Sequence, residues 1–252
     1  MNNLMFINKI HCEPMSISNW TKEADYDIKD HVDIWRVSLN QIKDKLRALK
    51  RYLTLEEMFK FSKFKQEGDR LRYLGGKSFL KILLARYLKC SPMDISFKEG
   101  INNKPMLNEI HGINFNLSHS NDWVVFGLCE EELGVDIEFI DSNFDFIPII
   151  NNWFSTPETH YIENAYSPRH EFFKLWTRKE ALLKATSVGM TQNLNVINCL
   201  DGTQYVPYEV GAGFSDWRIK SLFFEELYSL SVTFPVFYNQ IRLFEPQVTS
   251  IP

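Results

Sequence analysis

The order of the expected secondary structure constrains this chain most, because a strand, a long helix and further strands follow one another twice. The first series runs through residues 31–130 and the second through residues 134–233. A helix packed on a small sheet is a complete pair of layers, so this order favours an α+β protein with two similar halves. The acidic turn Glu130–Leu133 is the best boundary. We therefore expect an N-terminal half of 1–132 and a C-terminal half of 133–252 in one compact unit.

Hydrophobic periodicity places the individual elements. The expected strands are His31–Asn40, Asp94–Lys98, Phe115–Ser118, Trp123–Cys129, Gly134–Ile140, Gly202–Val210, Trp217–Phe223 and Tyr228–Thr233. The expected helices are Gln41–Leu53, Asp69–Leu88, Pro157–Asn164, Arg169–Thr186 and one that starts at Leu55. Thr54 and Glu57 have the spacing of a capping box at that start. The strands on either side of the acidic turn are expected to pair as a hairpin, and residues 245–252 to form a loose tail.

Positive charge is concentrated between Lys60 and Lys89. This segment holds nine basic and two acidic side chains, a net charge of +7, whereas the rest of the chain carries −11. A basic island in an acidic protein is a candidate anion site, although a solvated helix face is the commoner explanation. The island lacks the interleaved aromatic residues of a single-strand binder. We therefore expect a site for a few phosphates and no nucleic-acid partner.

The sequence gives no sign of a membrane or secretory protein. No apolar run reaches ~18 residues, and the first ten residues lack the basic start and apolar core of a signal peptide. The cysteines are scattered without a CxxC pair, so neither a zinc site nor a disulfide framework is indicated. They are Cys12, Cys90, Cys129 and Cys199. We expect a cytoplasmic protein with reduced thiols and no membrane partner.

Two carboxylates share one face of the expected strand Gly134–Ile140. Side chains alternate along a strand, so Asp136 and Glu138 project together while Val135 and Ile137 project to the other face. Two neighbouring carboxylates repel each other unless a cation lies between them. Oxygen ligands of this kind suit Mg²⁺ when substrate phosphates and waters complete its octahedron. Alone, however, such a pair is more often a solvated strand face.

The expected helix Arg169–Thr186 contains the string FFKLWTRKEALLK at 172–184. Helical spacing puts Trp176, Glu180 and Lys184 on one stripe. A Glu–Lys pair at this spacing is usually a surface salt bridge worth about 0.3–0.5 kcal/mol. The functional interpretation makes Glu180 a third carboxylate on the metal and Lys184 a phosphate ligand. Trp176 is assigned to the core.

A third motif, NFNLSHS, ends an expected strand at residues 114–120. His119 could form half of a hydrolase dyad with Ser118 or Ser120, but the chain has no G-x-S-x-G motif. A Ser-His pair that contacts phosphate is equally compatible with these residues. For a lone motif, a structural histidine remains the commoner case.

Together, NFNLSHS, GVDIE and FFKLWTRKEALLK resemble, in order and spacing, the Sfp-type 4′-phosphopantetheinyl transferases, which activate carrier proteins in peptide and polyketide synthesis. Asn103-Lys104-Pro105 lies where the family often has Gly-Lys-Pro. The helix DRLRYLGGKSFLKILLARYL resembles the region around the family's phosphate-binding arginine. The resemblance spans about residues 53–190. It implies two pseudo-twofold-related halves, each a small antiparallel sheet packed with a long helix, and an active site between the halves of a monomer.

The resemblance also implies roles for individual residues. Asp136, Glu138 and Glu180 match the Mg²⁺-binding carboxylates, and Asp136, Glu180 and Lys184 are the implied catalytic residues. The residues implied to contact coenzyme A are Lys60, Arg72, Lys104, Ser118, His119, Lys179 and Lys184. Two positions depart from the family pattern, since Asn103 and Ser187 stand where glycine is usual. Both lie in loops, so these departures bear on substrate positioning and not on the metal site.

The implied reaction transfers 4′-phosphopantetheine from coenzyme A to a serine of an acyl- or peptidyl-carrier protein, with Mg²⁺, and releases 3′,5′-ADP. Mg²⁺ and Lys184 would neutralise charge on the phosphoryl oxygens, and Glu180 would accept the serine proton directly or through water. Two alternatives remain open. A non-catalytic coenzyme A or nucleotide-binding module would not need three carboxylates, and a Mg²⁺-dependent phosphoesterase or nuclease would need a wider basic track.

Overall fold

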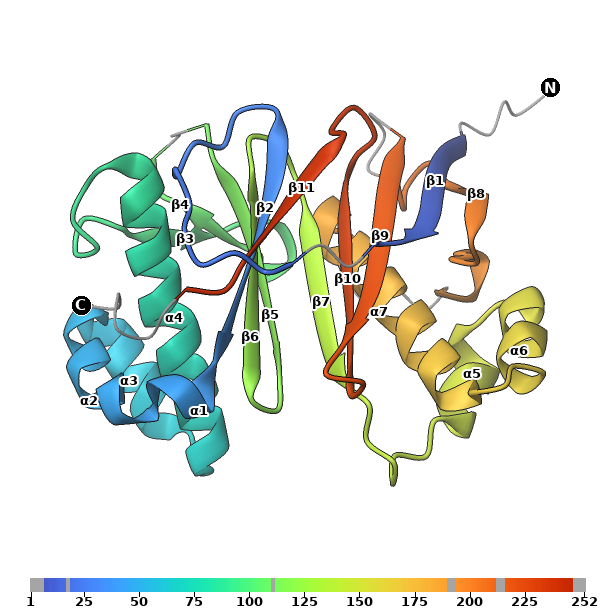
Figure 1. Ribbon diagram of the computed structural model, residues 1–252, viewed down its shortest axis with the longest axis horizontal. Helices are drawn as coiled ribbons and strands as arrows, with labels where there is room; N and C mark the ends of the chain where they lie inside the picture. Colours follow the sequence, from blue (N-terminus) through green and yellow to red (C-terminus); the bar gives the residue numbers. More distant parts are fainter. Residues whose placement is uncertain (1–6, 17–18, 110–111, 190–193, 212–215, 247–252) are drawn as a thin grey trace.

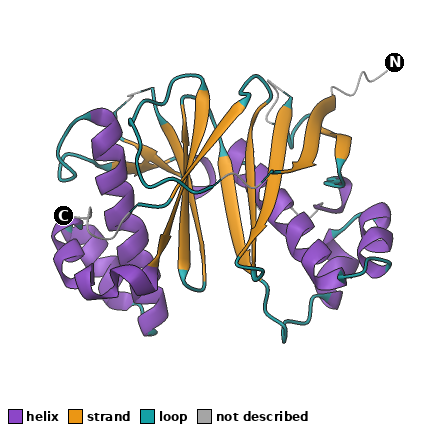
Figure 2. Cartoon of the chain, in the orientation of Figure 1, coloured by secondary structure: helices purple, strands orange, loops and turns teal. Residues whose placement is uncertain are grey.

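The computed structural model describes residues 7–16, 19–109, 112–189, 194–211 and 216–246. Its elements are arranged as four layers, in the order helix, sheet, sheet, helix (Figure 1). Coloured by secondary structure, the two sheets lie side by side in the centre with helices on both outer sides (Figure 2). The predicted α+β class, with two sheets that each pack on a long helix, is confirmed, but the sheets are mixed and not antiparallel as expected. In the described part of the chain, no helix is both long and apolar enough to cross a membrane.

The first sheet has the strand order β11-β2-β6-β5. Its strands are Gln240–Phe244 (β11), His31–Ser38 (β2), Trp123–Cys129 (β6) and Asn114–Ser120 (β5). One face packs on α4 (Glu67–Leu88), whose buried residues include Leu74, Phe79 and Leu83. These apolar positions recur at helical spacing, which is why the sequence predicts this helix to within two residues of its start.

Smaller elements surround α4. They are α1 (Leu39–Ile42), α2 (Leu46–Leu49), α3 (Leu55–Lys63), β3 (Phe97–Glu99) and β4 (Pro105–Leu107). The helix expected over Gln41–Leu53 is instead divided by two 3₁₀ turns, Lys43–Lys45 and Lys50–Tyr52. The start of α3 is as predicted, since Thr54 and Glu57 form both hydrogen bonds of the capping box.

The second sheet has the strand order β7-β10-β9-β1-β8. Its strands are Gly134–Phe139 (β7), Tyr228–Pro235 (β10), Trp217–Phe224 (β9), Ile7–Pro14 (β1) and Gly202–Pro207 (β8). The helix α7 (Pro168–Thr186) packs on it, together with α5 (Ile147–Trp153) and α6 (Thr156–Glu163). At Gly134 a Cβ atom would lie 2.0 Å from the carbonyl oxygen of Ala181, so only glycine lets α7 approach β7 this closely.

The hairpin expected between β6 and β7 is wrong. β6 pairs with β2 and β5, whereas β7 pairs with β10 in the other sheet. Every residue of β6 is buried, so both of its faces need cover. α4 covers one face and the second sheet covers the other, and residues 130–133 carry the chain between the sheets. A Cβ at Gly127 would lie 2.7 Å from side-chain atoms of Leu133 and Val135, which shows how closely the sheets approach.

The two halves exchange their terminal strands. β1, from the N-terminal half of the sequence, lies in the second sheet between β9 and β8. β11, from the C-terminal half, pairs with β2 in the first sheet. Both β1–β9 and β11–β2 are parallel, so each sheet contains one parallel pair among antiparallel ones. The boundary at Glu130–Leu133 thus marks the crossing between sheets, but the sheets themselves are not contiguous in sequence.

Candidate active site

The two sheets meet along β5 and β7, which are joined by side chains. The Oγ of Ser118 donates to Oδ1 of Asp136 at 2.9 Å. The Oγ of Ser120 donates to Oε2 of Glu138, also at 2.9 Å. Asn116 accepts a hydrogen bond from the backbone N–H of Val135. These β5 residues alternate along one face of the strand, so their spacing around Ser118 is the sequence signal that could have revealed Asn116 and Ser120.

Asp136 is almost fully enclosed, with 3% of its surface exposed. The Nζ of Lys184 lies 2.6 Å from its Oδ1, and the same ammonium donates to the Oγ of Ser118 at 3.0 Å. The other oxygen, Oδ2, is buried and has no hydrogen-bond partner among the described residues. A buried carboxylate oxygen without a partner is costly. One side of the Asp136 carboxylate is therefore ready to accept a cation or a donor.

Glu138 and Glu180 are held in an environment that resists ionisation. Burial, followed by repulsion from Asp136, raises the pKa of Glu138 to about 7. Burial and the same carboxylate also raise the pKa of Glu180 above its ordinary value. Lys184 opposes both shifts because its charge favours the ionised carboxylates. The three carboxylates on β7 and α7 thus share the ammonium of Lys184. Such an excess of acidic over basic groups is expected at a functional site.

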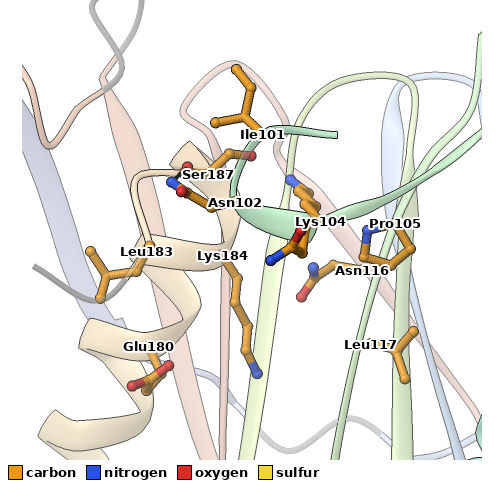
Figure 3. Close-up of a pocket in the computed structure, with 12 residues that line it drawn as sticks. Ile101, Asn102, Lys104, Pro105, Asn116, Leu117, Glu180, Leu183, Lys184 and Ser187 are labelled. Atoms are coloured by element: carbon orange, nitrogen blue, oxygen red, sulfur yellow. Dashed lines mark hydrogen bonds between the residues drawn. The ribbon is translucent and has the colours of Figure 1, made fainter. Parts of the chain in front are cut away.

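A pocket of about 220 Å³ opens beside these groups. Lys184 reaches from α7 toward Asn116 and Leu117 of β5, with Glu180 on the same helix (Figure 3). Lys104 closes the pocket from the loop before β4, where its Nζ lies 2.5 Å from Oε2 of Glu132. Since both halves of the chain line this pocket, it agrees with the expectation of a site between them.

The two residues that stand where the family usually has glycine adopt a backbone conformation that glycine favours. Asn103 has a φ of 61° and Ser187 a φ of 56°, both in the left-handed region. The neighbouring Asn102 has a φ of 51°, and its Nδ2 donates to the carbonyl oxygens of Ser187 and Val188 at 2.7 and 2.9 Å. Asparagine tolerates this region better than most residues do. The pocket loop and the end of α7 therefore keep a glycine-like backbone and are tied together.

Ser118 and His119 lie on opposite faces of β5, because successive side chains alternate. Ser118 faces Asp136, whereas His119 is on the side of α4 and Arg72. Partial desolvation, then the charges of Arg72 and Lys184, lower the pKa of His119. Arg72 itself lies 2.6 Å from Asp69 and donates to the carbonyl oxygen of Asn121.

Lys60 lies apart from these groups, at a larger cavity of about 580 Å³. It is half exposed and lies 3.3 Å from Glu56. Asn103 and Pro105 border both cavities, so the two are neighbours. The hydroxyl of Tyr73 is buried in the wall of the larger cavity and has no hydrogen-bond partner among the described residues. The sequence analysis had no signal for Tyr73.

Lys179 is not at the cleft. Its Nζ lies 2.9 Å from Oε2 of Glu158 on α6, and both side chains are fully buried. It also donates to the carbonyl oxygens of Leu194 and Ile197. One residue along a helix turns a side chain by about 100°. Lys179 therefore faces the core while Glu180 lines the pocket, and the structure does not bring Lys179 together with the other predicted coenzyme A ligands.

Charged groups gather at the pocket without forming a closed metal cage. Within the described ranges, no three His, Cys, Asp or Glu side chains are arranged so that they could together hold a metal ion. Mg²⁺ usually keeps several waters and binds through one or two carboxylates plus substrate phosphates. An incomplete carboxylate set is therefore the arrangement expected when a phosphate ligand supplies the remaining oxygens.

Comparison with known proteins agrees with this geometry. The model of the 4′-phosphopantetheinyl transferase superfamily matches residues 132–233, and that of the 4′-phosphopantetheinyl transferase N-terminal region matches residues 35–130. A relative from Synechocystis sp. is 32% identical over 177 residues, which cover 67% of this chain and 71% of the relative. The chain belongs to the 4′-phosphopantetheinyl transferase superfamily.

Further relatives carry the same family name. The 4′-phosphopantetheinyl transferase psf-1 of Bacillus pumilus is 30% identical over 169 residues, covering 64% of this chain and 72% of its own. HetI of Nostoc sp. is 29% identical over 174 residues, covering 66% of this chain and 72% of its own. A holo-(acyl-carrier-protein) synthase of Bacillus anthracis, solved in complex with CoA (3′,5′-ADP), is 20% identical. It aligns with a TM-score of 0.34 and covers 40% of this chain and 96% of that one.

Proposed function

We propose that this transferase moves the 4′-phosphopantetheine group from coenzyme A to a serine hydroxyl of an acyl- or peptidyl-carrier protein. The observation that carries the proposal is the meeting of Asp136, Glu138 and Glu180 with Lys184 beside a pocket lined by both halves. A module that only binds a nucleotide has no need of three carboxylates in competition for one ammonium. The relatives named as 4′-phosphopantetheinyl transferases support the same reaction.

The two neighbouring cavities fit the two ends of coenzyme A. Lys184 and Ser118 are placed to meet the pyrophosphate at the smaller pocket, where Lys104 supplies a second cation. The larger cavity offers two groups to the nucleotide end, Lys60 and the Tyr73 hydroxyl, which has no hydrogen-bond partner in the described part of the chain. Arg72 and His119, on the α4 side of β5, are candidates for the 3′-phosphate. In this assignment Lys179 has no contact with coenzyme A.

The residues at the pocket fit Mg²⁺. Asp136 has a buried oxygen without a hydrogen-bond partner among the described residues. Burial and the charge of Asp136 raise the pKa values of Glu138 and Glu180, and a bound cation would offset the cost of ionising these carboxylates. In the ligand-free arrangement no three described carboxylates are placed to hold an ion together, so one or two of Asp136, Glu138 and Glu180 would hold it first, with the pyrophosphate as a further ligand. When bound, the ion would neutralise charge that develops on the phosphoryl oxygens.

The transfer itself needs one proton acceptor and one further positive charge. The carrier serine Oγ attacks the phosphorus that bears the pantetheine arm, its P–O bond to the departing phosphate breaks, and 3′,5′-ADP leaves. Glu180, which lines the pocket, takes the serine proton directly or through a water. Lys184 stabilises the charge on the phosphoryl oxygens through its ammonium. No covalent enzyme intermediate is needed.

The setting of the reaction is part of the proposal. We propose a cytoplasmic monomer that acts on carrier domains of nonribosomal peptide or polyketide synthesis and binds neither nucleic acid nor membrane. The structure is consistent with the basic residues serving a small ligand, because several of them are already paired. Lys81 lies 2.9 Å from Glu57, and Arg72 pairs with Asp69, so the basic segment is not one continuous open surface.

The test is the mass of an apo-carrier domain after incubation with coenzyme A, Mg²⁺ and this protein. We expect a gain equal to phosphopantetheine with the wild type and none with Asp136→Ala. Glu163→Ala, an exposed carboxylate on α6, is the matched control and should behave as the wild type. Coenzyme A bound without any mass gain across several carrier types would favour the binding module. Coenzyme A hydrolysed without a modified carrier would favour the phosphoesterase.

A further inference from the structure

The ammonium of Lys184 is completely satisfied by the protein. It donates to Oδ1 of Asp136 at 2.6 Å, to the Oγ of Ser118 at 3.0 Å and to the carbonyl oxygen of Val135 at 3.3 Å. A lysine ammonium has three protons, so no donor is left for a phosphate in this arrangement. Lys184 can therefore serve a phosphate only after it gives up part of this set.

The Lys184 ammonium is bound to the Asp136 carboxylate, which is the carboxylate best placed to hold a divalent cation. Asp136 is the most enclosed of the three acidic residues, and its Oδ1 is shared between Ser118 and Lys184. Lys184 also opposes the rise in the pKa of Glu138 and Glu180 that burial and Asp136 cause. Its side chain is 29% exposed and lines the pocket, and its four-carbon stem can turn from the strand toward the pocket space.

We propose that Lys184 is a placeholder for the divalent cation: its ammonium neutralises Asp136 in the ligand-free protein and moves to the pyrophosphate when the cation binds. This inference rests on the proposed function, because it takes the pyrophosphate as the second partner of Lys184. It follows that the cation and coenzyme A bind cooperatively. Coenzyme A draws the ammonium away from Asp136, and by linkage the cation raises the affinity for coenzyme A by the same factor.

The neighbouring Lys104 provides a matched control. It lines the same pocket and carries the same charge, but it pairs with Glu132 and not with Asp136. Removing either lysine makes the pocket more negative, and that alone favours any cation. Only Lys184 competes for the Asp136 carboxylate. A comparison of the two variants therefore separates direct competition from a general electrostatic effect.

The experiment is a titration with Mn²⁺ alone, in which the electron paramagnetic resonance signal of free Mn²⁺ reports binding. Without coenzyme A, we expect Lys184→Met to bind Mn²⁺ about tenfold more tightly than the wild type, within the usual range of coupling between sites. Lys104→Met should remain within about twofold of the wild type. Adding coenzyme A should tighten Mn²⁺ binding more in the wild type than in Lys184→Met. Asp136→Asn in either background should remove the tight site.

Any of three results would contradict the proposal that Lys184 is a placeholder. Unchanged or weaker Mn²⁺ binding by Lys184→Met would do so, as would an equal gain in Lys104→Met, or no binding by any variant at millimolar Mn²⁺. Circular dichroism confirms that each variant is folded, and Lys184→Gln repeats the measurement with a different replacement. The titration needs neither a carrier nor turnover. A wild type that binds Mn²⁺ but never modifies a carrier would contradict the proposed function instead.

Discussion

The two sides of α7 hold similar charged groups in very different conditions. On the core side, Lys179 pairs with Glu158, and Arg178 donates to Ser221, to the carbonyl oxygen of Cys199 and to Asp201. Glu158 also accepts from the backbone N–H of Cys199, so each charged atom of these buried groups has a hydrogen-bond partner. On the cleft side, Asp136 keeps a buried oxygen that no described residue contacts by a hydrogen bond, and burial makes Glu138 and Glu180 resist ionisation.

This difference separates a structural charge pair from a functional one. Both sides come from one short string, TRKEALLK, so charge and spacing alone do not distinguish them. What distinguishes them is completeness: a buried pair with every donor and acceptor matched stabilises the fold, whereas an incomplete set is ready for a ligand. Substitutions on the core side should therefore change stability, and substitutions on the cleft side should change turnover.

The largest expected effect is on the core side. Lys179→Met leaves Glu158 as an unpaired buried charge, which should lower the free energy of unfolding by about 3–5 kcal/mol. Urea unfolding followed by circular dichroism measures the change. Lys60→Met, which removes a half-exposed lysine that pairs with Glu56, is the control and should cost less than about 1 kcal/mol. Equal losses in the free energy of unfolding for the two variants would contradict the distinction between the core side and the cleft side of α7.

The next effect is on the cleft side. Glu180→Gln keeps the size of the side chain but removes the proton acceptor, and Lys184→Met leaves phosphoryl charge uncompensated. Each should lower the turnover number by ~10²–10³, while the melting temperature moves little. Carrier modification and thermal unfolding should be followed on the same samples. Near-normal turnover in both variants would show that this side of α7 is an ordinary solvated helix face without a catalytic role.

Arg72 extends the comparison to the neighbouring face of β5. If it meets the 3′-phosphate, Arg72→Ala should weaken coenzyme A binding by about 1.5–3 kcal/mol and change dephospho-coenzyme A binding much less. Calorimetry with both ligands makes the measurement. Arg72 already pairs with Asp69, so part of the phosphate contact replaces an existing one. Equal losses for the two ligands would place Arg72 at the pyrophosphate or outside the site.

A separate effect is a pH dependence of stability without added metal. The pKa of Glu138 is about 7 in the folded protein against an ordinary value of 4.5. Between these values the folded state holds a proton that the unfolded state has released. The contribution of Glu138 to stability therefore decreases as the pH rises from about 4.5 to about 7, and is constant above. Urea unfolding across this range should show a slope that Glu138→Gln reduces. If Glu138→Gln shows the same slope as the wild type, the pH dependence comes from other groups.

Local pattern predicted the elements better than their partners. The bounds of β6 and the capping box of α3 follow from residues adjacent in sequence, and the structure reproduces both. The predicted hairpin failed because β6 and β7 are short, largely buried strands, and periodicity does not say which sheet a buried strand joins. β1 and β11 were missed as strands, and their places depend on partners about 200 residues away.

The prediction of the site residues shows the same division between what local pattern reveals and what depends on distant contacts. The spacing of Asp136, Glu138, Glu180 and Lys184 was enough to bring them together as candidates, because each pair lies on one strand or one helix. Lys179 was misplaced because the motif fixes its position on α7 but not which side of α7 faces the core. That side is decided by Glu158, whose location on a separate helix no local pattern reveals. Tyr73 became visible only with the cavity around it.

The exchange of β1 and β11 has a consequence for how the protein is made. As the chain leaves the ribosome, β1 emerges long before its partners β8 and β9, and β2 emerges long before residues 240–244, with which it pairs. Two fragments divided between residues 132 and 133 would each carry a strand that belongs to the other's sheet. Such fragments would complete their sheets only by associating, in the manner of a split reporter. Each terminal strand thus ties the two halves of the sequence together, and the two sheets are not both complete until β1 and β11 are in place.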